Sequence, residues 1–316
     1  SISIGANYRG FGLAPCLLEK ALRHFHDRER QISKIYAYVK TENMASRYAF
    51  IRAGFKDCVS DNKHALKYCY VYGNYLFEYF GLDREDSDRV FIIAEMSANH
   101  NHDFNIAVET VKAAKAAGAD AIKFQTYTAD TLTLDCDNAY FQIKQDTLWD
   151  GTTLYKLYQN AFTPWEWQPE LKHIAEEEGL ICFSSPFDKT SVDFLEAMDV
   201  PAYKIASFEI TDIPLIEYVA SKMKPVIIST GIATYEDIEG AIAACKRVGN
   251  DQIALLKCTS SYPAPVALAN LRTIPDMRER FKLPVGLSDH TMSSSVAIAS
   301  VALGARILEK HFILDR

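Results

Sequence analysis

The sequence lacks several features that mark whole classes of protein. No run of about 18 consecutive apolar residues occurs, so we expect no membrane span. No long cluster of lysine or arginine occurs either, and a net charge of -7 argues against a nucleic acid or membrane surface as partner. The seven cysteines contain no CxxC pair and give no sign of a disulfide framework or structural zinc site. A cytoplasmic protein that acts on small molecules is the favoured interpretation.

Two differently patterned regions are present. With 316 residues, 48% of them hydrophobic, the chain can form one large domain and a smaller one. Residues 83–89 are mostly charged and have no apolar periodicity, so they form the predicted linker between domains at 1–82 and 90–316. The chain begins at Ser1 rather than Met and stops just past a predicted strand. We therefore expect a fragment of a longer protein.

Short apolar runs alternate with helical patterns throughout the second region. This succession is typical of βα units in an α/β fold with a parallel sheet. Eight strands are predicted, which favours a closed (β/α)8 TIM barrel that lacks only its last outer helix. The strands are 91–97, 121–126, 181–185, 202–207, 225–230, 253–258, 285–288 and 305–312.

Polar residues recur at the carboxyl ends of these strands, where the active sites of such barrels lie. Burying lysine or glutamate in apolar strands without partners is costly, so packing alone does not explain the repetition. The sequence therefore predicts one shared site. Its candidate residues are Glu95, Asn99, His100, Lys123, Gln125, Ser184, Ser185, Lys204, Ser207, Glu209, Ser229, Thr230, Thr259, Ser260, Tyr262, Ser288, Asp289, His290, Glu309 and His311.

Two lysines in this set could hold an anion. Lys123 and Lys204, placed on neighbouring strands, could surround a phosphate and a carboxylate together with nearby serine hydroxyls. Phosphoenolpyruvate carries both groups.

Two histidines end the last two strands and should be adjacent. The imidazoles of His290 and His311, with open positions beside them, would suit Mn, Zn, Co or Fe. Glu95 and Glu209 could activate water, shuttle a proton or neutralise the lysines, and the residues alone do not divide these roles.

Eight segments, in chain order, resemble the sialic acid synthase family. The resemblance spans residues 91–316. Within that family, the segment SFEITDIPLI is most similar to the pseudaminic acid synthases. The segments are AEMSANHNHDF (94–104), KFQTYT (123–128), FSSPFD (183–188), KIASFEITDIPLI (204–216), IISTGIAT (227–234), KCTSSYPAP (257–265), GLSDHT (286–291) and ILEKHF (307–312).

The resemblance implies a reaction. An open-chain amino sugar would condense with phosphoenolpyruvate and water to give a nonulosonic acid and phosphate. For the pseudaminic subgroup the sugar is 2,4-diacetamido-2,4,6-trideoxy-L-altrose, whereas N-acetylneuraminate or legionaminate synthesis is the alternative. The family also implies a homodimer and a C-terminal antifreeze-like domain, which lies outside this chain.

The resemblance also implies roles for residues. A divalent metal, Mn²⁺ with Mg²⁺ and Co²⁺ as alternatives, would be held by His290 and His311. The implied catalytic residues are Glu95, Glu209, Lys123, Lys204 and Tyr262. The implied substrate contacts are Gln125, Ser185, Ser207, Ser229, Ser288 and Asp289.

Two departures from the wider family bear on the sugar. Phe208 stands where the sialic acid synthases have glycine, and Lys257 stands where they have histidine. An apolar ring beside the sugar would suit a 6-deoxy diacetamido sugar better than one rich in hydroxyls, because hydroxyls buried without partners are unfavourable.

The first region resembles the C-terminal half of the CoA-dependent N-acetyltransferases. YRGFGLA (8–14) precedes a helical pattern, and a strand at 35–39 leads to TENMASRYAFIRAGF (41–55). The implied acetyl-CoA contacts are Arg9, Gly10, Gly12, Ala14 and Asn43. Phe50 stands where that superfamily commonly has a catalytic tyrosine, so an inactive remnant is the other interpretation.

Three alternatives remain open. A related condensing enzyme, such as 3-deoxy-octulosonate 8-phosphate synthase, would need a second phosphate site for its phosphorylated sugar. An amino-sugar N-acetyltransferase with the barrel as scaffold would transfer acetyl groups without consuming phosphoenolpyruvate. A non-catalytic sugar-binding protein would not explain why lysine, serine and histidine recur at the strand ends.

Overall fold

The computed structural model describes residues 14, 17–18, 21–22, 34–52, 55–58, 65–71, 89–144 and 150–315. The chain divides into two compact units, Ser1–Asn74 and Tyr75–Arg316. Of the predicted linker, only Arg89 lies among the described residues, so the linker stays a prediction.

The N-terminal unit contains a three-stranded sheet and a helix. Strands β1 (Lys34–Lys40), β2 (Lys56–Cys58) and β3 (Ala65–Val71) pair antiparallel in the order β1-β3-β2. The predicted strand at 35–39 is confirmed as β1. Helix α2 (Met44–Arg52) follows Asn43, whose Oδ1 accepts a hydrogen bond from the Ser46 backbone N–H at 3.0 Å.

The acetyl-CoA contacts expected in this unit stay predictions. Arg9, Gly10 and Gly12 lie outside the described residues, and Ala14 is a half-buried helical residue. The Asn43 carbonyl group already serves to cap α2, so that side chain has a structural role whether or not it contacts CoA.

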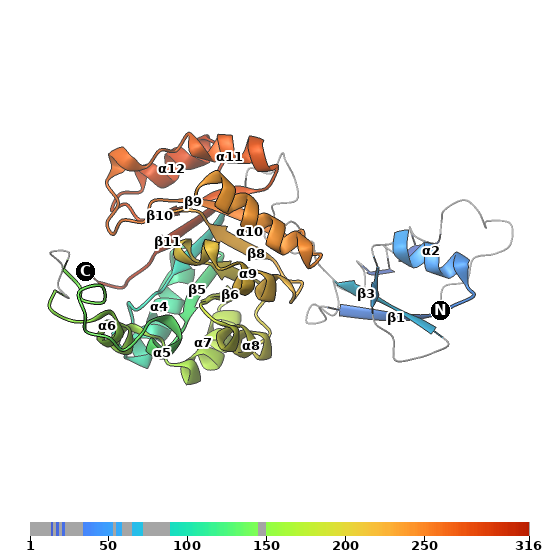
Figure 1. The fold of residues 1–316 in the computed structure, drawn as a ribbon, viewed down its shortest axis with the longest axis horizontal. Coiled ribbons are helices and arrows are strands. Elements are labelled where there is room, and N and C mark those ends of the chain that lie inside the picture. The colour runs from blue at the N-terminus through green and yellow to red at the C-terminus, as the bar shows by residue number, and fades with distance from the viewer. Residues whose placement is uncertain are drawn as a thin grey trace. The chain divides into compact units, whose positions relative to one another are not determined.

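The second unit is the predicted barrel (Figure 1). Its strands pair in parallel and close in the order β10-β11-β4-β5-β6-β7-β8-β9, which confirms the fold and all eight predicted strands. The strands are β4 (Phe91–Glu95), β5 (Ala121–Thr126), β6 (Ile181–Pro186), β7 (Tyr203–Ile205), β8 (Val226–Ser229), β9 (Ile253–Cys258), β10 (Val285–Asp289) and β11 (Ile307–His311).

Helices surround these strands, and α11 and α12 pack against β10 (Figure 1). Several begin at side-chain caps; Asp103, for example, accepts from two backbone N–H groups of α4, and Gly118 follows that helix with φ +89°. The α-helices are α4 (Phe104–Ala116), α5 (Ala129–Leu132), α6 (Leu154–Ala161), α7 (Gln168–Glu177), α8 (Lys189–Ala197), α9 (Ile213–Ala220), α10 (Tyr235–Arg247), α11 (Thr273–Phe281) and α12 (Ser295–Ala302). Three short 3₁₀ helices are η2 (Trp165–Trp167), η3 (Ser207–Thr211) and η4 (Val266–Leu268).

The amino-end rim of the barrel carries buried polar side chains that are fully engaged. Asn250 Nδ2 donates to the backbone oxygens of Ala220 and Lys224 at 3.0 and 2.8 Å. Lys224 Nζ pairs with Asp199 at 3.1 Å and with Glu196 at 3.4 Å. These contacts tie the loops that precede β8 and β9 to the helix layer. None of the described helices is both long and apolar enough to cross a membrane.

Candidate active site

The register of the barrel brings charged and polar residues from four strands together at its carboxyl end. Glu95 on β4 stands opposite Lys123 on β5 and opposite His311 on β11. Glu309 of β11 stands opposite Ser288 of β10. Parallel pairing places these side chains at one rim, as such a barrel requires of its active site.

Four buried charges form the centre of this site. The Lys123 ammonium forms an ion pair with Glu95, and it lies 3.9 Å from Glu309 Oε2. Lys204 Nζ lies 3.8 Å from Glu309 Oε1. All four side chains are buried. Glu309 therefore bridges the two lysines.

Two expectations need amendment here. The expectation that Lys123 and Lys204 stand on neighbouring strands was wrong, because β6 lies between β5 and β7. Glu309 was expected to support the histidines, as a carboxylate that fixes an imidazole tautomer or completes a metal shell, whereas in the structure it lies between the two lysines.

Burial and neighbouring charge set these protonation equilibria. Burial raises the pKa of Glu95, and the Lys123 charge only partly offsets it. Burial also opposes ionisation of Glu309, but Lys123 and Lys204 outweigh that effect and hold its pKa below the usual range. Burial lowers the pKa of Lys204. Of the two carboxyls, Glu95 is the one that takes up a proton more readily.

Three of the four predicted serine hydroxyls contact this charge cluster. Ser185 Oγ accepts from Lys123 Nζ at 3.2 Å, and Ser229 Oγ accepts from Lys204 Nζ at 2.6 Å. Ser288 Oγ donates to Glu309 Oε1 at 2.9 Å. These groups form a compact set of cations and hydroxyls that could hold a phosphate and a carboxylate.

The fourth serine lies beside a buried thiol. Ser207 Oγ donates to Cys258 Sγ at 3.4 Å and accepts from the Gly231 backbone N–H at 3.2 Å. Cys258 was not singled out from the sequence, because a cysteine in an apolar strand looks like an ordinary core residue.

Two further predicted residues lie near the cluster. Gln125 Nε2 donates to Glu95 Oε1 at 2.9 Å. Glu209, in η3, has a buried Oε2 with no hydrogen-bond partner among the described residues, and burial raises its pKa. Beside it, Phe208 is 61% exposed.

The two histidines are close to each other and to a tyrosine. The ring centroids of His290 and His311 are 5.4 Å apart, and the Tyr262 ring lies 4.2 Å from the first and 5.9 Å from the second. His290 Nδ1 lies 2.9 Å from the Thr259 carbonyl oxygen. A carbonyl only accepts, so Nδ1 carries the proton and Nε2 keeps a free lone pair.

The electrostatic surroundings of the two rings differ. Partial burial of the ring and the positive charges of His290 and Lys123 lower the pKa of His311. Burial also disfavours charge on His290, but the Cys258 thiol outweighs burial and raises the pKa. His311 is therefore the imidazole more readily kept neutral.

Two imidazoles fit a divalent transition metal once both are neutral, because each ring then offers a lone pair. Within the described part of the chain, no group of three or more His, Cys, Asp and Glu side chains is arranged to hold one. A metal held here would have two protein ligands, with its other positions left to substrate and water.

The Asp289 side chain points away from the cluster of lysines and glutamates. Successive strand residues point to opposite faces, and Ser288 faces Glu309 whereas Asp289 pairs with Lys310 at 2.6 Å. Asp289 Oδ1 also accepts from the Thr291 N–H at 2.9 Å. The structure therefore does not bring this carboxylate together with the lysines, and its role in substrate binding stays a prediction.

Known proteins similar to this chain share its barrel. Residues 110–316 match the NeuB family. The chain is 49% identical to the pseudaminic acid synthase of Campylobacter jejuni over 72% of its length, and 40% identical to the N,N'-diacetyllegionaminic acid synthase of Legionella pneumophila over 74%. It spans 66% of each of these relatives, just under two thirds.

A solved structure agrees with these matches. The N-acetylneuraminic acid synthetase of Leptospira borgpetersenii superposes with a TM-score of 0.64 at 30% identity, covering 83% of this chain and 79% of that one. The family model covers well over half of the chain, and it includes seven of the eight barrel strands. The chain therefore belongs to the NeuB family.

Proposed function

We propose that this chain carries the catalytic barrel of a pseudaminic acid synthase. It would condense phosphoenolpyruvate with 2,4-diacetamido-2,4,6-trideoxy-L-altrose and water, giving pseudaminic acid and phosphate. The observation that carries the proposal is the pair of buried lysines, Lys123 and Lys204, flanked by hydroxyls at the rim where His290 and His311 lie together. The 49% identity to pseudaminic acid synthases favours this sugar over the alternatives.

In this proposal the lysines hold phosphoenolpyruvate. Their ammonium groups, with the hydroxyls of Ser185 and Ser229, would donate to the phosphate and carboxylate oxygens. Glu95 and Glu309 neutralise the lysines before substrate binds, so the anionic substrate must replace part of that compensation. Glu95 would then take up a proton, since its buried carboxyl favours the neutral form.

Carbon-carbon bond formation follows from placing the two substrates face to face. As C3 of phosphoenolpyruvate bonds to the aldehyde carbon of the sugar, the C2–C3 π bond and the carbonyl π bond break. Positive charge develops at C2, and the aldehyde oxygen becomes an alkoxide that takes up a proton to form a hydroxyl group. A divalent metal held by His290 and His311, Mn²⁺ with Mg²⁺ and Co²⁺ as alternatives, would polarise the aldehyde oxygen when bound. The exposed Tyr262 ring lies beside both imidazoles and would border the sugar site.

Water addition at C2 requires a group that accepts a proton. Glu209 suits this role better than Glu95, because among the described residues no ion pair or hydrogen bond engages its Oε2, whereas Lys123 is ion-paired with Glu95 and Gln125 donates to it. The tetrahedral adduct then collapses and expels phosphate with the bridging oxygen. The oxygen from water becomes the keto oxygen of the product.

We further propose a cytoplasmic homodimer, as the family implies. Four cysteines of the second unit, Cys136, Cys182, Cys245 and Cys258, are free thiols, which suits a reducing compartment.

Phosphate release tests the proposed function. The full-length protein would be incubated with phosphoenolpyruvate and either the trideoxy diacetamido sugar or N-acetylmannosamine, with Mn²⁺ present or chelated. We expect metal-dependent release with the first sugar. Release with N-acetylmannosamine alone would make the protein a sialic acid synthase, and release with neither sugar would contradict the proposal.

A further inference from the structure

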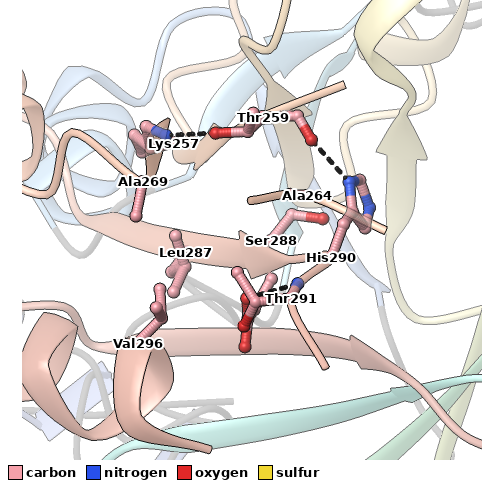
Figure 2. A pocket seen from close by; sticks show the side chains of 10 residues that line it. Lys257, Thr259, Ala264, Ala269, Leu287, Ser288, His290, Thr291 and Val296 are labelled. Atoms are coloured by element: carbon pink, nitrogen blue, oxygen red, sulfur yellow. Dashed lines mark hydrogen bonds between the residues drawn. The ribbon is translucent and has the colours of Figure 1, made fainter. Parts of the chain in front are cut away.

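Lys257 is a buried lysine outside the charge cluster. It is the fifth residue of β9 and is 6% exposed. Its strand neighbour Cys258 faces the rim residue Ser207, so Lys257 points to the opposite face, toward the helix layer. There it lines a small pocket, together with Leu287 of β10 and Val296 of α12 (Figure 2).

The surroundings of Lys257 offer little compensation for its charge. Within the described ranges, no carboxylate forms an ion pair with it, and Asp289, which lines the same pocket, is held by Lys310. Burial lowers the pKa of Lys257. A methionine of similar length would fill the same space beside Leu287 and Val296 without desolvating a charge, so packing alone does not account for a lysine here.

Hydrogen bonds connect Lys257 through Thr259 to His290 in the candidate active site. Its Nζ donates to Thr259 Oγ1 at 2.7 Å, and that hydroxyl donates to the Leu268 carbonyl oxygen at 3.4 Å. The Thr259 side chain is thus held from two sides. The backbone carbonyl of the same residue accepts from His290 Nδ1 at 2.9 Å, and Figure 2 shows both bonds meeting at Thr259.

We propose that Lys257 is a positioning residue that orients the His290 imidazole through Thr259. By fixing Thr259, it fixes the carbonyl that selects the Nδ1–H tautomer of His290 and leaves Nε2 directed at the rim. The inference rests on the proposed function in one respect: it takes His290 to be a metal ligand.

The test compares two buried lysines of the barrel. Lys257→Met removes the ammonium and keeps the length of the side chain. Lys224→Met is the matched control, because Lys224 is 8% exposed but ion-paired at the other rim. The full chain would be used for both. The measurements are the Mn²⁺ dissociation constant by electron paramagnetic resonance, the His290 side-chain ¹⁵N spectrum and the unfolding midpoint.

We expect Lys257→Met to weaken Mn²⁺ binding by about 10- to 100-fold, the usual effect of losing a group that orients a metal ligand. The His290 Nδ1–H signal should shift or broaden, and the midpoint should not fall. Lys224→Met should lower the midpoint and leave Mn²⁺ affinity and the His290 signal unchanged. Thr259→Val, which keeps the carbonyl but loses the hydroxyl, should weaken Mn²⁺ binding similarly, and the double variant should add nothing further.

A purely structural role would give the opposite pattern. If Lys257→Met lowers the midpoint while Mn²⁺ affinity stays within twofold and the His290 signal is unchanged, the proposal is overturned. If the wild-type protein binds no Mn²⁺, the proposed metal chemistry fails by itself. The His290 spectrum of Lys257→Met then decides the positioning role, with an unchanged signal overturning it.

Discussion

The two rims of the barrel treat buried polar groups in opposite ways. At the amino end, Asn250 donates hydrogen bonds to backbone carbonyls, and Lys224 forms an ion pair with Asp199. At the carboxyl end, Glu209 and Glu309 each keep a buried oxygen with no hydrogen-bond partner among the described residues. Buried polar groups without partners cost free energy, so they mark the rim that a ligand completes. In the proposed function, the amino-end rim stabilises the barrel and the carboxyl-end rim binds the substrates.

The largest expected effect comes from removing a lysine of the binding rim. Lys204→Met should lower kcat/KM for phosphoenolpyruvate by about 10²- to 10³-fold, because a buried cation that stabilises developing anionic charge is lost. Its unfolding free energy should change little, since burial already disfavours the Lys204 charge. Steady-state kinetics and urea unfolding measure the two quantities. An unchanged kcat/KM together with a large fall in unfolding free energy would contradict the division between the rims.

A substitution at the amino-end rim should have the opposite effect, lowering stability but not activity. Asn250→Ala leaves the carbonyls of Ala220 and Lys224 without their donor, at a cost of roughly 2–4 kcal/mol in unfolding free energy. Below its unfolding temperature, kcat/KM should equal that of the wild type. A tenfold fall in kcat/KM of the folded variant would show that the two ends are not independent.

A pH dependence should arise at the binding rim from His100, in the loop after β4. This imidazole is fully buried, and Nε2 contacts Thr163 Oγ1 at 2.9 Å. Burial lowers its pKa to about 4, below the unfolded value of 6.5. The unfolded chain therefore binds more protons between these values, so stability falls as pH drops through that window.

Between pH 7.5 and pH 5 this contribution should remove roughly 2 kcal/mol of unfolding free energy. His100→Gln should show a smaller loss over the same range. His102→Gln, on the neighbouring exposed residue, is the control and should behave as the wild type does. Equal pH dependence in all three proteins would exclude His100 as the cause.

The smallest expected effect concerns the sugar. Phe208 is exposed beside Glu209, so Phe208→Gly should leave folding unchanged and reduce the preference for the trideoxy sugar over N-acetylmannosamine by about tenfold. Competition between the two sugars in one reaction measures this ratio. An unchanged ratio would remove Phe208 from the sugar site.

Sequence alone could predict the barrel but not all of its site. Buried parallel strands read as continuous apolar runs, so a polar residue such as Lys123 within one is conspicuous. Which face a residue at the end of a strand points to depends on where the pleat ends, and the sequence does not mark that point. Asp289 was therefore grouped with Ser288, although Ser288 contacts Glu309 and Asp289 contacts Lys310. The bridging position of Glu309 depends on the register of β11, which composition does not encode.

The most direct test of the binding rim is calorimetric titration of phosphoenolpyruvate into the wild type, Lys204→Met and Asn250→Ala. The account predicts that Asn250→Ala binds as the wild type does and that Lys204→Met loses at least about 100-fold in affinity. Equal affinity in Lys204→Met, or no binding by the wild type, would contradict the placement of phosphoenolpyruvate at this rim.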